Sequence, residues 1–324
     1  MLTPAGELRR VLAAPASTLF TALVAARNAL YDAGRLRQRR LRRPVISVGN
    51  LSVGGAGKTP LVILLAELLR QRGVRADVLS RGYGRRSSGV LVVDSGGSAA
   101  RFGDEPLLMA RRLPDVPVLV GERRYQAGLE AERRWQTDVH LLDDGFQHRQ
   151  LARDFDIVLL SRRDLEDRLL PAGRLREPLS ALARADAVVW SEPEDVPALP
   201  VSMPVWRVRR RVEIPQPSPA RPFVFCAIGG PQRFLQDLAS DGVHVAGQHW
   251  FRDHHAYTDA DVQRLCQEAS SAGADGFLTT EKDAVKLEGL QAQLPKLAVV
   301  RLSLELENAE AALAAMLEKA RITG

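Results

Sequence analysis

The sequence is poor in lysine, in cysteine and in long apolar runs. Of its 45 basic residues only five are lysines, at positions 58, 282, 286, 296 and 319. A codon bias toward arginine explains the general scarcity, but lysine is a compact point charge where arginine is a planar fork, so each remaining lysine is of interest. The two cysteines, Cys226 and Cys266, are too far apart for a short metal or redox motif. No uninterrupted apolar stretch of about 18 residues occurs, so a conventional membrane-spanning helix is not expected.

Beyond residue 43 the chain carries no excess of basic over acidic residues. The 324-residue chain has a formal net charge of +6. Residues 1–43 hold nine arginines and two acids, a net +7, so the rest of the chain sums to −1. A near-neutral body disfavours a protein that binds nucleic acid over its whole surface. At about 150 residues per domain, the length predicts two globular domains.

An apolar helix followed by basic residues opens the chain. Residues 11–31 carry a helical stripe of apolar side chains, and six arginines follow within residues 35–43. An amphipathic helix with a basic cluster suits an anionic membrane surface. The alternative is a helix docked on the protein's own core. We take residues 1–43 as an N-terminal membrane-associating helix and basic arm.

From Pro44 onward, short apolar runs alternate with helical segments. The expected strands cover 44–50, 76–80, 90–94, 117–121, 138–144, 155–161 and 186–191, with helices at 58–72 and 121–136. This alternation predicts an α/β fold with a mostly parallel sheet covered on both faces. The first α/β domain is expected over residues 44–200.

Prolines mark a boundary after this domain. Eight of the 19 prolines fall within residues 191–222, and residues 206–214 alternate with period two, so 201–222 is expected to be an extended linker. A second, smaller α/β domain is expected over 223–324. Its strands are predicted at 223–229, 276–280 and 298–304, and its helices at 231–240, 258–272 and 307–321.

The strongest local signal lies between the first expected strand and helix. The residues there are Ser52, Val53, Gly54, Gly55, Ala56, Gly57, Lys58 and Thr59. Glycines let backbone N–H groups turn toward phosphate oxygens, and the following helix points its positive end at the anion. In such a P-loop, Lys58 reaches the β- and γ-phosphates of a nucleotide and Thr59 places its hydroxyl on Mg²⁺. The strict pattern has glycine where this chain has Ser52.

Two acidic pairs lie where catalysis would need carboxylates. Asp143 and Asp144 end an expected strand, and adjacent strand residues point to opposite faces, so the two would divide their roles around a metal ion. A plain strand-end turn is the alternative. Asp104 and Glu105 stand at an expected loop–helix junction, where helix capping is the alternative.

Two other charged groups complete the candidates. Arg176 and Glu177 follow a Pro-Ala-Gly loop, and His254 and His255 follow Asp253. Two histidines alone make a poor metal site. A histidine near a carboxylate can accept a proton at neutral pH, because its ordinary pKa is about 6.5.

Eight motifs, in order along the chain, resemble those of the tetraacyldisaccharide 4′-kinases, the lipid A 4′-kinases of Gram-negative bacteria. They are VGNLSVGGAGKTP (48–60), SRGYGRR (80–86), FGDEP (102–106), LLDDGFQHR (141–149), PAGRLREPLSAL (171–182), FCAIGGPQRF (225–234), FRDHH (251–255) and LTTEKDAVK (278–286). The resemblance implies transfer of the γ-phosphate of ATP, with Mg²⁺, to the 4′-hydroxyl of a tetraacylated glucosamine disaccharide 1-phosphate. It also implies a peripheral or monotopic protein at the cytoplasmic face of the inner membrane. Its partners would be this lipid A precursor and the anionic membrane surface, with no nucleic acid.

The resemblance assigns roles residue by residue. Residues 52–59 would bind ATP within a P-loop kinase domain, and the second domain would contribute to the active-site cleft. The implied catalytic residues are Asp104, His254, Lys58 and Arg176, with His255 left open as the alternative histidine. The implied metal candidates are Thr59, Glu105, Asp143, Asp144 and Glu177. The implied substrate-binding candidates are Asn50, Arg81, Tyr83 and Gln147.

Without the resemblance, the residues are also compatible with two other functions. A P-loop kinase of a soluble substrate would not need the apolar and basic arm. A nucleotide-switched membrane adaptor would not need a histidine-bearing second domain or the additional acids. No guanine-reading N-K-x-D motif is present, which favours ATP.

Overall fold

The computed structural model describes residues 4–55, 57–192 and 194–322, and the chain forms two compact units. Unit 1 comprises residues 1–79, 123–209 and 306–324, and unit 2 comprises 80–122 and 210–305. The segment 80–122 therefore groups with the later part of the chain and not with the strands that flank it in sequence. The expected functional division into 44–200 and 223–324 stays a prediction.

Unit 1 is built on a parallel sheet. Its strand order is β8-β7-β6-β1-β5-β2, and each of these neighbouring pairs is parallel. The strands are β1 (Val45–Asn50), β2 (Ala76–Ser80), β5 (Val139–Asp143), β6 (Phe155–Leu160), β7 (Ala187–Trp190) and β8 (Val205–Glu213). The first five are buried throughout, which is why their sequences read as apolar runs.

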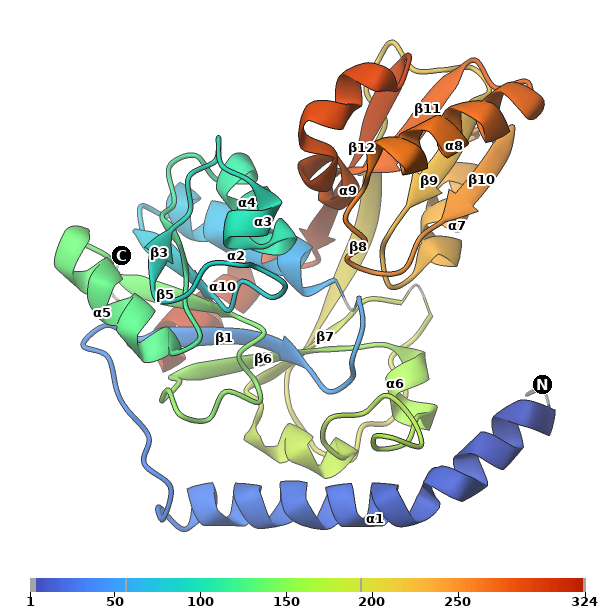
Figure 1. Ribbon diagram of the computed structural model, residues 1–324. Coiled ribbons are helices and arrows are strands. Elements are labelled where there is room, and N and C mark those ends of the chain that lie inside the picture. Colours follow the sequence, from blue (N-terminus) through green and yellow to red (C-terminus); the bar gives the residue numbers. More distant parts are fainter. Residues whose placement is uncertain (1–3, 56, 193, 323–324) are drawn as a thin grey trace. The chain divides into compact units, whose positions relative to one another are not determined.

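The helices of unit 1 include a long N-terminal one, drawn in dark blue in Figure 1. They are α1 (Pro4–Asp32), α2 (Lys58–Gln71), α5 (Arg124–Arg134), α6 (Arg162–Glu166), the 3-10 helix η1 (Leu179–Arg184) and α10 (Ala309–Lys319). The Ser17 hydroxyl on α1 donates to the Leu169 carbonyl at 3.1 Å, while Leu19 and Leu23 are 63% and 61% exposed. Within the described part of the chain, no helix combines the length and apolar character needed to cross a membrane.

Unit 2 contains a second parallel sheet and a short antiparallel strand pair. The sheet runs β10 (Gly247–Trp250), β9 (Pro222–Cys226), β11 (Gly276–Thr280) and β12 (Leu297–Leu306). β3 (Leu91–Val92) and β4 (Val118–Val120) form the antiparallel pair. The helices are α3 (Ala99–Phe102), α4 (Asp104–Arg112), α7 (Pro231–Ser240), α8 (Asp259–Ser271), α9 (Glu281–Leu287) and η2, a 3-10 helix (Glu288–Gln293).

The predicted α/β class with mostly parallel sheets is confirmed, and the differences lie in short elements. The sequence reading missed β10, because Gly-Gln-His-Trp is not an apolar run, and it missed α9, which is only seven residues long. The strand expected at 90–94 is reduced to Leu91–Val92, both half-buried. These short elements include α9, which contributes to the candidate site below.

Candidate functional site

The glycine-rich loop of unit 1 connects β1 to α2. Gly54 and Gly57 have φ of 108° and 85°, a backbone region that favours glycine, so the loop turns sharply at both. Gly57 is the N-cap of α2, and no side chain caps this helix end, which leaves its N–H groups to an anion. The start of the loop is anchored, since the Val53 N–H donates to the Arg174 carbonyl at 2.8 Å. Ala56 lies outside the described residues.

Lys58 and Arg176 converge on the same two oxygen-bearing side chains. The Lys58 ammonium donates to Asn50 Oδ1 at 2.9 Å and lies 3.4 Å from Asp144 Oδ1. Arg176 binds both carboxylate oxygens of Asp144, at 2.9 and 3.0 Å, and also donates to Asn50 Oδ1. Two cations and one carboxylate therefore meet at the loop, leaving a net positive site suited to phosphate.

The two neighbouring aspartates differ in conformation. β5 ends at Asp143, which is 3% exposed, while Asp144 has a φ of 50°, a conformation that aspartate tolerates better than most residues. Desolvation acts to raise the pKa of Asp144, but the Arg176 hydrogen bond and the Lys58 charge outweigh it and lower that pKa well below its usual range. Asp144 is therefore ionised at neutral pH and engaged with cations.

Two other predicted residues of unit 1 connect this site to α1. Gln147 Nε2 donates to the Asn50 carbonyl at 3.1 Å, and Arg27 donates to the Gln147 carbonyl at 2.8 Å. Glu177, 1% exposed, accepts hydrogen bonds from Asn28 at 2.7 Å and from Arg184 at 2.9 Å. The first helix is thus attached directly to residues predicted for the site.

The oxygen donors of unit 1 suit a hard cation. Thr59 and Asp143 are buried at the ends of α2 and β5, and Glu177 Oε1 is buried without a hydrogen-bond partner among the described residues. Hydroxyl and carboxylate oxygens are the ligands Mg²⁺ prefers, typically one or two carboxylates completed by substrate phosphates. The side chains of the described residues form no cluster of three or more His, Cys, Asp or Glu suited to a metal. Thr59, Asp143 and Glu177 are thus candidate oxygen donors of the chemical type that Mg²⁺ binds.

In unit 2, a glycine sets the position of Asp104. Gly103 has a φ of 91°, and a Cβ there would lie 3.0 Å from the Tyr83 carbonyl oxygen, so the motifs 80–86 and 102–106 meet at a point that only glycine fits. α4 begins at the next residue, and Asp104 is 6% exposed in its first turn. The positive end of the helix favours a carboxylate here.

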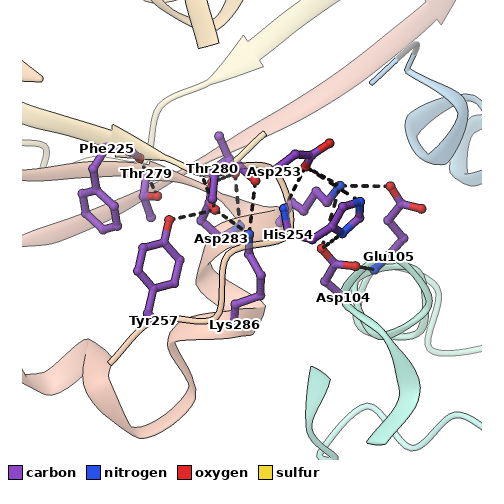
Figure 2. A network of polar contacts seen from close by, with 12 residues as sticks. Asp104, Glu105, Phe225, Asp253, His254, Tyr257, Thr279, Thr280, Asp283 and Lys286 are labelled. Carbon is purple, nitrogen blue, oxygen red and sulfur yellow. Dashed lines mark hydrogen bonds and ion pairs between the residues drawn. The ribbon is translucent and has the colours of Figure 1, made fainter. Parts of the chain in front are cut away.

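Asp104 pairs with His254 (Figure 2). His254 Nδ1 lies 2.9 Å from Asp104 Oδ2, and Asp104 Oδ1 accepts the Glu105 N–H at 3.0 Å. His254 has a φ of 60°, which turns the chain sharply within the motif 251–255. The imidazole is 29% exposed and packs at a ring distance of 5.2 Å on Tyr83. One histidine nitrogen is thus held while the ring stays accessible.

The charges around this pair fix its protonation. Burial acts to raise the pKa of Asp104, but the His254 hydrogen bond and the Lys282 charge lower it overall. The same hydrogen bond raises the pKa of His254, against desolvation and the Lys282 charge. Asp104 is therefore a carboxylate in contact with His254 Nδ1, and Nε2 is the ring nitrogen that lies outside this pair.

The structure separates the two candidate histidines. His255 Nε2 lies 3.0 Å from Asp261 Oδ2, and its ring stacks on Phe251 at 4.6 Å. Asp261 also closes the capping box of α8 with Thr258. His255 therefore belongs to a structural network, and His254 alone of the two faces Asp104.

The predicted site residues fall into two groups, one per unit. Unit 1 brings together Asn50, Lys58, Asp144, Gln147 and Arg176 around the loop formed by residues 52–59. Unit 2 brings together Tyr83, Asp104, Glu105 and His254, while Arg81 is exposed and makes no side-chain hydrogen bond or ion pair with these four residues. Glu105, predicted as a metal ligand, instead accepts a hydrogen bond from Lys282 at 3.0 Å. Sequence reasoning did not assign Lys282 or Asp253 to the site; the rarity of lysine was the available signal.

The fold and the two groups of residues define an α/β phosphotransferase. A sequence model of the tetraacyldisaccharide-1-phosphate 4′-kinase family matches residues 9–321. The chain belongs to this family, so the predicted family and the kinase class are confirmed.

Relatives and a solved structure agree over most of the chain. The tetraacyldisaccharide 4′-kinase of Koribacter versatilis is 51% identical, covering 92% of this chain and 96% of its own, and that of Aquifex aeolicus is 41% identical, covering 86% and 90%. The crystal structure of an "apo" form of LpxK from Aquifex aeolicus in complex with ATP matches with a TM-score of 0.80 at 38% identity, over 96% of this chain and 99% of that one.

Proposed function

We propose that this kinase transfers the γ-phosphoryl group of ATP to the 4′-hydroxyl of tetraacyldisaccharide 1-phosphate, in lipid A biosynthesis, at the cytoplasmic face of the inner membrane. The observation that carries the donor site is the convergence of Lys58 and Arg176 beside the uncapped start of α2. Backbone N–H groups and two cations there suit a triphosphate. The family and the ATP complex of the Aquifex relative support the same donor.

In the proposed reaction the 4′-oxygen bonds to the γ-phosphorus as the bond from that phosphorus to the bridging oxygen breaks, releasing ADP. The hydroxyl proton passes to His254 Nε2, while Asp104 holds Nδ1–H and stabilises the imidazolium that forms. Lys58 and Arg176 balance the negative charge on the transferring group. Asn50 orients both cations, since its side-chain oxygen accepts a hydrogen bond from each.

For the metal we propose Mg²⁺ held by oxygens of unit 1. Thr59 and Asp143 are the first candidate ligands. Asp144 and Glu177 are the weaker candidates, because Asp144 is paired with Arg176 and Lys58, and Glu177 is paired with Arg184 through Oε2. When bound, Mg²⁺ would neutralise phosphate charge and orient the β- and γ-oxygens. Glu105 is not proposed as a ligand, because Lys282 occupies it.

For the membrane we propose a peripheral contact through residues 1–43. Leu19, Leu23 and Leu30 are exposed on α1, and the basic residues 35–43 follow directly. Apolar side chains beside arginines suit an anionic lipid surface. The hydrogen bonds from α1 to Gln147 and Glu177 would then couple the membrane contact to the loop site.

One assay tests the proposed reaction. The full chain is incubated in detergent with γ-labelled ATP, Mg²⁺ and tetraacyldisaccharide 1-phosphate, and labelled lipid is separated by chromatography. Labelled lipid is expected from the wild type and none from Lys58→Ala, because the variant lacks the cation that the loop itself provides for the phosphates. Hydrolysis of ATP without labelled lipid would instead favour the adaptor function, and transfer by Lys58→Ala would refute the donor site.

A further inference from the structure

Three carboxylates of unit 2 share one ammonium group. Lys282 Nζ lies 3.0 Å from Glu105 Oε1, 3.4 Å from Asp253 Oδ1 and 3.8 Å from Asp104 Oδ2. Its side chain is 17% exposed, so these contacts are only partly screened by water. Burial acts to lower the pKa of Lys282, but the three carboxylates outweigh it and raise that pKa, so the group is an ammonium ion.

These carboxylates come from the two segments that make the histidine–aspartate pair. Asp104 and Glu105 begin α4, and Asp253 directly precedes His254 in the turn 251–255. Figure 2 shows Asp104 and Glu105 facing Asp253 and His254. Lys282 stands in the first turn of α9, which packs against α4, and so it connects both sides of the pair.

The other side chains of α9 hold its first turn in place. Thr280 caps the helix by accepting the Asp283 N–H. Asp283 is fully buried and accepts hydrogen bonds from the Ala227 N–H, the Tyr257 hydroxyl and Thr280, and Lys286 lies 2.9 Å from it. The backbone at Lys282 is therefore held in place, while its ammonium group lies outside this network, near Asp104.

The charges indicate what Lys282 does. Without it, Asp104, Glu105 and Asp253 would place three negative charges beside one imidazole. Asp253 would then be repelled from the start of α4, and His254, its neighbour in the chain and already in a left-handed conformation, would move with it. A displacement of about 1 Å at a reacting group can cost about a hundredfold in rate.

We propose that Lys282 is a positioning residue for phosphoryl transfer, which sets the distance between Asp104 and His254 by binding the carboxylates on both sides of that pair. This inference rests on the proposed function. Lysine suits the task because a single ammonium, unlike the planar guanidinium of arginine, can donate hydrogen bonds in three directions from one point.

The test is a double-mutant cycle on the full chain with labelled ATP and the lipid substrate. Lys282→Gln should lower kcat by about 10- to 100-fold and leave the KM for ATP within about twofold, because the ATP site proposed above lies in unit 1. In an Asp104→Asn background the same change should cost less than about threefold, because the pair it serves is already lost. If the role of Lys282 were purely structural, Lys282→Gln would lower kcat by the same factor in the wild-type and Asp104→Asn backgrounds. That result, or an unchanged kcat in the single variant, would overturn the proposal.

Arg112→Gln is the matched control. Arg112 also joins α4 to α9, through Glu281 at 2.9 Å, and makes no hydrogen bond or ion pair with Asp104 or His254. Its kcat should stay within about twofold of the wild type, and a loss equal to that of Lys282→Gln would overturn the proposal.

A second variant covers the case in which Lys282→Gln does not fold. Lys282→Arg keeps the positive charge among the carboxylates and should fold, yet its wider head group should still lower kcat at least about fivefold. Wild-type kcat in this variant would overturn the proposal. Absence of labelled lipid from the wild-type chain is a different result, which would refute the proposed function and this inference with it.

Discussion

Two of the histidine–aspartate pairs in the described part of the chain have nearly the same local geometry and very different surroundings. In unit 2, His254 Nδ1 lies 2.9 Å from Asp104, and in unit 1, His140 Nδ1 lies 2.9 Å from both carboxylate oxygens of Asp77. Asp77 and His140 stand opposite each other on the neighbouring strands β2 and β5. In each pair the carboxylate raises the pKa of the histidine.

The two pairs differ in solvent exposure and in what the second ring nitrogen, Nε2, contacts. His140 and Asp77 have no exposed surface, and His140 Nε2 faces Glu132 of α5 at 3.4 Å. His254 is 29% exposed and has a φ of 60°, and its Nε2 lies 3.8 Å from Asp253 Oδ1. A histidine–aspartate hydrogen bond therefore does not define a proton-transfer site, because the free nitrogen must also reach a substrate.

The largest expected difference between the pairs is in turnover. Asp104→Ala should lower kcat by about 10²–10⁴-fold, because Asp104 holds the proton acceptor. Its melting temperature should change less than that of Asp77→Ala, because the histidine it leaves behind is 29% exposed and stays hydrated. Asp77→Ala should do the reverse, with a stability loss of about 3–5 kcal/mol, because it leaves the fully buried His140 ring with Glu132 as its remaining carboxylate partner. Labelled-lipid assays and thermal unfolding on both variants measure the two effects.

A control within the same motif sharpens this contrast. His255→Gln removes a histidine next to His254 in sequence that pairs with Asp261 instead. Its kcat, corrected for folded protein, should stay within about threefold of the wild type. A loss comparable to that of Asp104→Ala would mean that the roles of the two histidines had been assigned the wrong way round.

The same contrast explains what could be predicted from sequence. The loop 52–59 was predictable because glycines, a lysine and a strand–helix context are local features, and the FGDEP and FRDHH motifs carried the family resemblance. The sequence did not reveal that Asp77 and His140 form a pair, because each is a single residue near the start of a mostly apolar strand and their contact depends on strand register. The network of Lys282 was hidden for a similar reason, since it joins residues nearly 180 positions apart in the chain.

The next expected effect is on the pH dependence of turnover. The Asp104 hydrogen bond raises the pKa of His254, which also faces Lys282, Asp253 and the Tyr83 ring. A proton acceptor works in its neutral form, so kcat/KM should rise with pH through this raised pKa. Asp104→Asn removes the largest cause of the shift, so its residual activity should show the same rise at lower pH. Profiles that rise at the same pH in both proteins would argue against His254 as the proton acceptor.

The smallest expected effect is on the pH dependence of stability, and it concerns the buried pair. Asp77 and Glu132 raise the pKa of His140 in the folded protein against the effect of burial, whereas the unfolded chain has a histidine pKa of about 6.5. Between these two pKa values the folded state binds more protons, so the stabilisation is complete below about pH 6.5 and is lost as the pH rises through the folded pKa. The free energy of unfolding should fall there by at most about 1.4 kcal/mol per pH unit relative to a His140→Gln variant.

Urea unfolding of both proteins at several pH values measures this difference, and histidine NMR titration of the wild type gives the folded pKa directly if the variant does not fold. A folded His140 pKa at or below 6.5 would show that burial outweighs the two carboxylates, and the two pairs would then differ in charge as well as in access.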